Sequence, residues 1–440
     1  MKFYIHKLGC PKNDVDADYI CARLIDQGHV VVSSPEKAES IIVNSCCFIE
    51  PAKEESIENI LSLAQLKDRG VLQALYVSGC LSQRYGDELL SAMPEIDGAF
   101  GIGELDAIAE TISSSVKPDK AIRTPPGKLC YLDWTQRYIA DNFPYAYLKI
   151  SDGCNHGCTY CAIPGIRGRF RSRPMSSILE EARFLAMNGK KELVLVSQDA
   201  TSYGRDLRDK IGLVDLLREL DRIEEVNWIR LLYLYSGQID NELIDYMVSD
   251  NKTLSYFDLP LQHINSDILA AMGRKIDRAA IEDLLAKIRS GNSKAVLRVT
   301  FIVGFPGETK AQFEELYDFT ITQRFEHMAA FMYSAEEGTR AVKMDRQVRT
   351  STKAQRLDRL MSLQREIAFD RNVSLIDTFS DVIIDSVESD GVAFGRTQGD
   401  CPEIDQEVLV HGGNPGVGDI VRVQITDADG YDLKAVICEE

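Results

Sequence analysis

The sequence lacks any long apolar run. Nowhere in its 440 residues is there a stretch of about 18 apolar residues, the length that a membrane-spanning helix needs. The first residues, Phe3-Tyr4-Ile5, already resemble a strand, and no basic segment followed by an apolar one precedes them, so we expect no signal peptide. These absences predict a cytoplasmic protein that makes no contact with a membrane.

Positive charge is also scarce. The 50 Lys and Arg residues are outnumbered by 68 Asp and Glu, which gives a formal net charge of −18. Residues 374–440 alone contain fifteen acidic and three basic residues, a net charge of −12, which leaves −6 for the rest. Nucleic-acid binding depends largely on Lys and Arg neutralising phosphates, so we expect no extended contact with RNA. The acidic segment is expected to attract a basic protein, although acidity can also serve solubility alone.

Cysteine, in contrast, is frequent, with 11 residues in the chain. An odd number without a secretory signal indicates reduced thiols and metal binding rather than a disulfide framework. Cys154, Cys158 and Cys161 share one loop with the spacing CxxxCxxC. Thiolates so close repel one another unless a cation holds them, so the loop predicts a metal ion or an iron–sulfur cluster. A cubane held by only three cysteines leaves one iron free to bind a small chelating molecule.

Two other interpretations of this loop stay open. Zinc could be bound by the three thiolates, with His156 or a distant residue as the fourth ligand. The cysteines could also be inert buried residues, but their close spacing and the flanking Gly153 and Gly157 argue against this.

A second set of cysteines lies in the first 115 residues. Cys10, Cys46 and Cys80 each follow a short apolar run, and helical patterns separate these runs. Alternating strands and helices predict a parallel sheet, in which all carboxyl ends of the strands lie along one edge. The three thiols are therefore expected to meet in space. Each could instead be an ordinary small buried residue, and Cys47 makes the middle ligand ambiguous.

The fold is predicted to be α/β with three domains, because 440 residues exceed one ordinary core. Residues 1–115 form the parallel-sheet domain, and 116–142, which contain two proline-rich turns, form a linker. Residues 143–372 form a partial (β/α)6 barrel, and 373–440 form a small antiparallel β-barrel of five short strands. The strand-like runs of the central domain are Tyr145–Ile150, Glu192–Gln198, Trp228–Leu234, Tyr256–Leu261, Val296–Gly304 and His327–Tyr333.

The active site of such a barrel lies at the carboxyl ends of its strands, where the CxxxCxxC loop follows the first strand. An arginine-rich segment comes next, with Arg167, Arg169, Arg171 and Arg173 at alternate positions. If this segment is extended, all four side chains point to one side. They could then hold reactants near an anionic cluster or bind an acidic substrate. A solvated basic loop is the alternative.

These motifs together resemble the radical S-adenosylmethionine methylthiotransferase family over nearly the whole chain. The resemblance is carried by Gly9-Cys10-Pro11-Lys12-Asn13, Asn44-Ser45-Cys46, Ser78-Gly79-Cys80, Ser151-Asp152-Gly153-Cys154-Asn155-His156, Ser197-Gln198-Asp199, Pro260-Leu261-Gln262-His263 and Tyr333-Ser334-Ala335-Glu336-Glu337-Gly338-Thr339. The sequence is most similar to the branch that modifies an aspartate of ribosomal protein uS12. The branch that acts on tRNA adenosine typically has Gln-Met-Asn where this chain has Pro11-Lys12-Asn13. Ser45 and Ala200 stand where the family usually has Thr.

The resemblance implies methylthiolation of the β-carbon of that aspartate. Cys154, Cys158 and Cys161 would hold the 4Fe–4S cluster that binds S-adenosylmethionine and generates a 5′-deoxyadenosyl radical. The auxiliary 4Fe–4S cluster, which carries the sulfur, would be held by Cys10, Cys46 and Cys80. One S-adenosylmethionine methylates that sulfur, and a second supplies the radical that takes hydrogen from the substrate. A radical is needed because an unactivated C–H bond has no usable acidity.

The expected contacts to S-adenosylmethionine are Tyr160, Gln198 and Arg298; the last two occupy barrel strands. The C-terminal barrel resembles a TRAM domain. Expected partners are uS12, free or in the small ribosomal subunit, a flavodoxin- or ferredoxin-type electron donor, and a sulfur source; direct tRNA binding is not expected.

The alternative functions are a tRNA adenosine methylthiotransferase, a non-catalytic iron–sulfur electron carrier or assembly factor, and a zinc-holding binding module.

Overall fold

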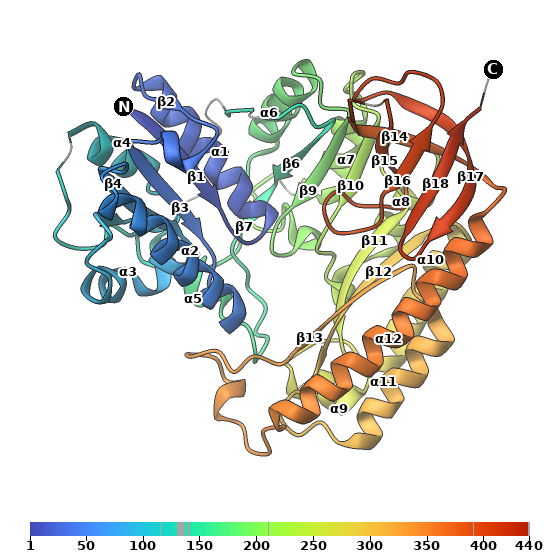
Figure 1. Ribbon diagram of the computed structural model, residues 1–440. Helices are drawn as coiled ribbons and strands as arrows, with labels where there is room; N and C mark the ends of the chain where they lie inside the picture. Colours follow the sequence, from blue (N-terminus) through green and yellow to red (C-terminus); the bar gives the residue numbers. More distant parts are fainter. Residues whose placement is uncertain (115, 130–136, 140, 210, 390, 439–440) are drawn as a thin grey trace.

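The computed structural model describes residues 1–440 except 115, 130–136, 140, 210, 390 and 439–440. An N-terminal α/β unit, a central open barrel and a small C-terminal barrel lie next to one another (Figure 1). Part of the predicted linker, together with Cys130, falls outside the described residues. Within the described part of the chain, no helix has both the length and the apolar character needed to cross a membrane.

The N-terminal unit contains a five-stranded sheet in the order β2-β1-β3-β4-β5, and all its pairings are parallel. Its strands are β1 (Lys2–Lys7), β2 (Val30–Val31), β3 (Ser40–Ser45), β4 (Ala74–Gly79) and β5 (Gly98–Ala99), and its helices are α1 (Pro11–Asp26), η1 (Pro35–Lys37), α2 (Glu50–Asp68), α3 (Cys80–Ala92) and α4 (Leu105–Ser114). Two apolar clusters form the core of this unit. β3 is buried along its whole length, as central parallel strands are, and its middle residues Ile41–Val43 form a short apolar run. The predicted parallel-sheet domain is confirmed.

The central barrel consists of two three-stranded parallel sheets, β10-β9-β6 and β11-β12-β13, with β10 next to β11. Its strands are β6 (Tyr145–Lys149), β9 (Glu192–Val196), β10 (Trp228–Leu231), β11 (Tyr256–Gln262), β12 (Val296–Val303) and β13 (His327–Met332), and a short hairpin pairs β7 (Ser151–Asp152) with β8 (Arg171–Ser172). Each of the six predicted strands is present, with ends that differ by a few residues.

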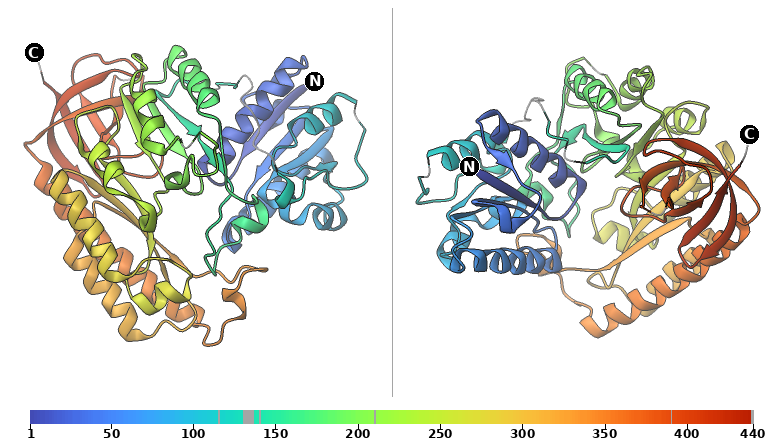
Figure 2. Two further views of the ribbon diagram at one scale, coloured as in Figure 1. Left: turned by 180° about the vertical axis from the view of Figure 1, so that it is seen from behind. Right: turned by 45° about the horizontal axis from the view of Figure 1, so that its top comes forward.

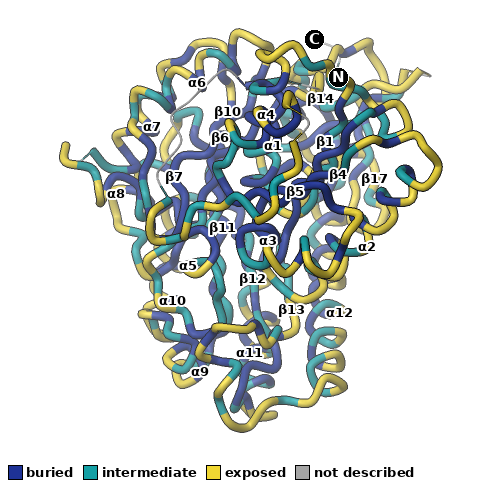
Figure 3. The backbone as a smooth tube through the Cα atoms, turned by 90° about the vertical axis from the view of Figure 1, so that its left-hand side faces the viewer, coloured by how far each residue is buried: buried dark blue, intermediate teal, exposed yellow. Residues whose placement is uncertain are grey.

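Helices cover the outer side of these two sheets (Figure 2). They are α6 (Met175–Met187), α7 (Leu213–Asp221), α8 (Asn241–Val248), α9 (Ser266–Ala271), α10 (Arg278–Gly291), α11 (Lys310–Gln323) and α12 (Thr350–Leu375), with the short turns η3 (Ala200–Ser202), η4 (Ser236–Gln238) and η5 (Ala341–Lys343). Helix α5 (Ile163–Ile166) instead packs against α3 of the N-terminal unit and against the turn η2 (Pro126–Lys128). On β12, Val299 and Phe301 are fully buried in the helix-covered core, whereas Thr300 and Ile302 on the other face are only partly buried. The inner face of the barrel is therefore the more open one. In Figure 3 the strands are largely buried, and exposed residues follow the outer helices and loops.

The C-terminal unit is a closed five-stranded barrel in the order β14-β15-β16-β18-β17. Its strands are β14 (Phe379–Val387), β15 (Ala393–Thr397), β16 (Val408–His411), β17 (Ile420–Asp429) and β18 (Asp432–Ile437). The barrel was expected to be antiparallel, but β16 and β18 pair in parallel, because β17 takes the chain around the barrel before β18 closes it. Helix α12 continues to Leu375 and so runs past residue 372. The domain boundaries at 115, 142 and 372 stay predictions.

The loop between β15 and β16 closes the amino end of the central barrel. Glu403 accepts hydrogen bonds from the hydroxyls of Tyr145 and Tyr147, both at 3.0 Å. Asp405 accepts a hydrogen bond from Tyr256 at 2.5 Å, and His327 contacts the carbonyl of Gly399 at 2.9 Å. All four barrel side chains stand at or near the start of their strands. Glu403 and Asp405 thus serve to attach the C-terminal unit to the barrel, and the side chain of Asp405 is buried there.

Candidate active site

The first cysteine set gathers in the loop that follows β7. Gly153 begins this loop with φ +77°, and a Cβ at that position would lie 2.1 Å from the carbonyl oxygen of Arg169. The amide of Cys154 donates to the carbonyl of Gly168 at 3.1 Å. The glycine therefore allows a turn in which the loop packs tightly against the segment that carries the arginines.

The three thiols of this loop lie close enough to influence one another. Burial, with a smaller contribution from the charge of Cys158, raises the pKa of Cys154 to about 11 and that of Cys161 to about 12. All three side chains are partly buried. These thiols are therefore neutral at neutral pH in the protein alone, and a bound metal ion or cluster would ionise them.

The second set comes together at the carboxyl edge of the N-terminal sheet, as the strand pattern predicts. Cys10 caps α1, Cys46 follows β3, and Cys80 begins α3 directly after β4. A Cβ at Gly9 would lie 2.7 Å from the Cβ of Cys46, so the first two cysteine segments touch. Burial raises the pKa of Cys80 to about 12, with the charge of Arg167 acting against this rise and those of Cys46 and Cys10 contributing to it.

Cys47 has a different environment. Its Sγ donates to the carbonyl of Cys80 at 3.1 Å, and its side chain is fully buried in the apolar core of the N-terminal unit. This thiol already has a packing role and a hydrogen-bond acceptor, which supports Cys46 as the ligand.

Among the described residues, no three His, Cys, Asp or Glu side chains converge as ligands of a single metal ion. His156, the candidate fourth zinc ligand, contacts Asp199 at 2.6 Å and stacks on Tyr235 with ring centroids 3.8 Å apart. An iron–sulfur cluster binds its thiolates through separate irons, so it tolerates wider spacing than one ion does. Both cysteine sets fit a cluster of this kind better than zinc.

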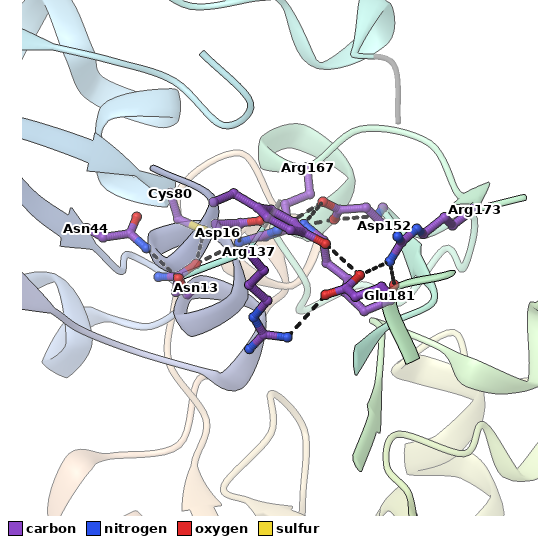
Figure 4. A network of polar contacts seen from close by, with 12 residues as sticks. Asn13, Asp16, Asn44, Cys80, Arg137, Asp152, Arg167, Arg173 and Glu181 are labelled. Carbon is purple, nitrogen blue, oxygen red and sulfur yellow. Dashed lines mark hydrogen bonds and ion pairs between the residues drawn. The ribbon is translucent and has the colours of Figure 1, made fainter. Parts of the chain in front are cut away.

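A buried polar network lies between the two cysteine sets (Figure 4). Arg167 is only 1% exposed and donates to both carboxylate oxygens of Asp152, at 3.2 and 3.1 Å. The same guanidinium donates to Asn13 at 2.7 Å and to Asp16 at 3.2 Å, and both of these residues belong to α1. Asp152 precedes the CxxxCxxC loop, and Asn13 lies beside Cys80 with a contact of 3.8 Å. One side chain thus links the segments that carry the two cysteine sets.

The arginine-rich segment does not form the one-sided row that an extended chain would. Arg167 and Arg173 are buried and bind different carboxylates, whereas Arg169 is exposed. The prediction fails because the segment begins with α5 and because Gly168 has φ +77°, which interrupts the extended alternation. The solvated-loop alternative is also wrong for Arg167 and Arg173. No pattern in the sequence marked Asn13 and Asp16 as partners of Arg167.

Unsatisfied polar groups collect at the carboxyl edge of the barrel. Both amide atoms of Gln198 are buried and lack a hydrogen-bond partner, and so do the hydroxyls of Ser151, Ser197 and Ser236. These residues belong to β7, the end of β9 and the turn after β10. Buried polar groups without partners are uncommon in proteins, and a polar ligand would satisfy them. Gln198 is therefore well placed for the expected S-adenosylmethionine contact.

The other two expected ligand contacts lie in different places. Tyr160 belongs to the cysteine loop and is partly buried next to the apolar cluster that contains Phe305 and Tyr333. Arg298 stands near the start of β12 and pairs with Asp258 at 3.1 Å and with Asp405 at 3.3 Å. Its strand is therefore as expected, but its guanidinium is at the amino end of the barrel, under the C-terminal unit.

Comparison with known proteins identifies the class first. Residues 148–320 match the Radical SAM superfamily, residues 2–101 match the Uncharacterized protein family UPF0004, and residues 378–438 match the TRAM domain. The fold resembles that of the radical S-adenosylmethionine methyltransferase TsrM from Kitasatospora setae, with a TM-score of 0.55 and 15% identity over 75% of this chain and 74% of that one. It also resembles the cobalamin-dependent enzyme OxsB, with a TM-score of 0.52 and 11% identity over 83% and 56%. The chain is a radical S-adenosylmethionine enzyme.

The particular family follows from nearly full-length relatives. The chain is 43% identical over 430 residues to the ribosomal protein uS12 methylthiotransferase RimO of Caldanaerobacter subterraneus subsp. tengcongensis, covering 98% of both. It is 42% identical to RimO of Geobacter sulfurreducens, covering 97% and 96%, and 41% identical to RimO of Clostridioides difficile, covering 100% and 99%. The chain belongs to the RimO family and is a radical S-adenosylmethionine methylthiotransferase.

Proposed function

We propose that this enzyme methylthiolates the β-carbon of an aspartate in ribosomal protein uS12, using two 4Fe–4S clusters and two molecules of S-adenosylmethionine. The observation that carries the proposal is the pair of cysteine triads on either side of Arg167, in a chain whose full-length relatives are named for this reaction. The clusters and S-adenosylmethionine, when bound, supply a 5′-deoxyadenosyl radical at the triad Cys154, Cys158 and Cys161. They supply a methylated sulfur at the triad Cys10, Cys46 and Cys80.

Each part of the chain has a role in this reaction. Cys154, Cys158 and Cys161 hold the cluster that binds S-adenosylmethionine, and Gln198 and Tyr160 contact that molecule. Arg298 is not needed for this contact because its guanidinium already binds two carboxylates.

Cys10, Cys46 and Cys80 hold the auxiliary cluster. The network around Arg167 fixes α1 against the barrel, so that the two reactive centres keep a constant separation. Such fixed positioning is the main contribution a protein makes when its cofactors carry out the chemistry.

The proposed setting is cytoplasmic. A flavodoxin- or ferredoxin-type protein supplies electrons, a separate source supplies sulfur, and uS12 binds either free or within the small subunit. The acidic C-terminal unit supports a basic protein substrate over tRNA, because negative charge repels phosphate.

The test is an anaerobic reaction of the cluster-reconstituted enzyme with S-adenosylmethionine, reductant and purified uS12. Mass spectrometry of uS12 should reveal a methylthio group on one aspartate, with formation of 5′-deoxyadenosine. If the enzyme modified tRNA and left uS12 unmodified, it would belong to the tRNA branch. Failure to form any 5′-deoxyadenosine would favour a non-catalytic iron–sulfur protein.

A further inference from the structure

Lys12 is an unusual buried cation at the boundary between the N-terminal unit and the barrel. It is the second residue of α1, two positions after Cys10, and its side chain is only 6% exposed. Its Nζ lies 3.5 Å from the centre of the Tyr233 ring. Tyr233 follows β10, so the lysine extends from the auxiliary triad to the barrel.

Most buried cations among the described residues have carboxylate partners. Those that pair with Asp or Glu are Arg137, Lys149, Arg167, Arg173, Lys190, Arg230, Arg356 and Arg396. Within the described residues, only Lys12 and Arg274 are buried cations that form no ion pair with a carboxylate. A buried charge without a counter-ion is costly, so such a group suggests a missing anion.

Arg274 belongs to the other reactive centre. Its guanidinium lies 4.1 Å from the Tyr235 ring centre and donates to the carbonyl of Pro260 at 2.7 Å. Tyr235 in turn stacks on His156 of the CxxxCxxC loop. Lys12 is therefore the unpaired cation on the side of the auxiliary triad.

The ring beneath Lys12 is held firmly. Tyr233 has φ +62°, its amide donates to Asp258 at 2.9 Å, and its carbonyl accepts from the amide of Ala200 at 3.0 Å. Ala200 comes two residues after Gln198, whose amide lacks a partner. The ammonium of Lys12 therefore lies between the auxiliary triad and the unsatisfied polar groups around Gln198 at the carboxyl edge of the barrel.

We infer that Lys12 binds the side-chain carboxylate of the substrate aspartate. This inference rests on the proposed function, in which the reacting β-carbon is one bond from that carboxylate. A cation that fixes the carboxylate also fixes the carbon between the radical source and the sulfur. The auxiliary cluster is the other anion expected near Lys12, and the iron content of the variants below distinguishes the two roles.

The test compares Lys12→Met with Lys53→Met in the reconstituted full-length enzyme. Lys53 belongs to the same unit and also faces a tyrosine ring, at 5.8 Å, but it pairs with Glu50. Each variant is assayed with uS12 that carries the target aspartate and with uS12 in which asparagine replaces it.

We expect Lys12→Met to lower kcat/KM for the aspartate substrate by about 30-fold or more, the usual effect of removing one member of a buried charge pair. The preference of the wild type for aspartate over asparagine should fall by a similar factor. Iron content and the 5′-deoxyadenosine formed without uS12 should stay unchanged. Lys12→Arg should recover part of the activity, because it restores the charge, and Lys53→Met should match the wild type.

Two results would overturn the inference. One is an unchanged preference for aspartate in Lys12→Met, and the other is a loss of iron from the auxiliary triad that accounts for the lost activity. Both leave the proposed function standing as long as the wild type modifies uS12. A wild-type enzyme that does not modify uS12 would instead remove the proposed function, and the inference with it.

Discussion

Arg167 and Asp152 form a two-pronged ion pair, with Nη1 at 3.2 and 3.1 Å from the two carboxylate oxygens, and both side chains are almost completely buried. The pair joins the segment before the CxxxCxxC loop to α1 through the further contacts of Arg167 with Asn13 and Asp16. A single guanidinium can serve three partners because its donors have a fixed, planar arrangement.

Arg167→Met should therefore destabilise the protein strongly. Removing one partner of a buried pair typically costs about 3–5 kcal/mol, and here it leaves Asp152 and Asp16 to share the charge of Lys149. Urea unfolding measures this loss. Arg218→Met is the control, because Arg218 forms only solvent-exposed pairs and should change stability by about 0.5 kcal/mol or less. Equal effects of the two substitutions would contradict the structural role given to Arg167.

The grouping of the cysteines could be predicted from the sequence because it depends on short spacing and on a regular repeat. The spacing of Cys154, Cys158 and Cys161 is visible in one loop, and the repeat of strand, cysteine and helix places Cys10, Cys46 and Cys80 at one sheet edge. The structure brings the segments of each set together, and their role as cluster ligands stays a prediction.

The polar network could not be predicted in the same way. The partners of Arg167 lie about 150 positions earlier in the chain, at Asn13 and Asp16, and no local pattern connects them. Arg298 illustrates a related difficulty. Its strand was predicted correctly, but a ligand contact would require Arg298 to lie at the carboxyl end of β12. It lies near the amino end, where the loop that contains Asp405 reaches it from the C-terminal unit.

Gly153 provides a test of the loop geometry. A methyl group there would meet the carbonyl of Arg169 at 2.1 Å, so Gly153→Ala must displace the cysteine loop. We expect lower iron content at this triad and loss of most 5′-deoxyadenosine formation. Gly189→Ala is a matched control: Gly189 also has a positive φ of +85°, but nothing lies within 4 Å of its added Cβ. The control should cost only about 1 kcal/mol of stability and keep the wild-type iron content.

His327 makes attachment of the C-terminal unit depend on pH. Burial alone would lower the pKa of His327, but the carboxylates of Asp405 and Asp400 outweigh burial and Arg371 and raise it above the usual value. A raised folded-state pKa means that the charged form stabilises the fold. This contribution is complete below about pH 6.5 and is lost as the pH rises through the folded-state pKa.

Unfolding free energies measured at pH 6 and pH 9 would reveal this effect. The wild type should lose more stability over that range than His327→Gln, by about 1.4 kcal/mol for each unit by which the pKa is raised. His411→Gln, at an exposed position, should follow the wild type. Parallel curves for wild type and His327→Gln would show that the imidazole charge does not hold the unit in place.

Gln198 offers a prediction in which ligand binding and stability respond in opposite directions. Its amide is buried and lacks a partner, so in the protein alone it costs free energy, whereas with S-adenosylmethionine bound it would gain hydrogen bonds. Gln198→Ala should weaken binding of S-adenosylmethionine by about tenfold, as measured by anaerobic equilibrium dialysis, and leave the ligand-free protein equally stable or more stable. Gln364→Ala should leave binding of S-adenosylmethionine unchanged and lower the stability of the protein, because Gln364 is buried and donates to the carbonyl of Phe325 at 3.0 Å. A loss of stability in Gln198→Ala without weaker binding would make Gln198 a structural residue and remove it from the ligand site.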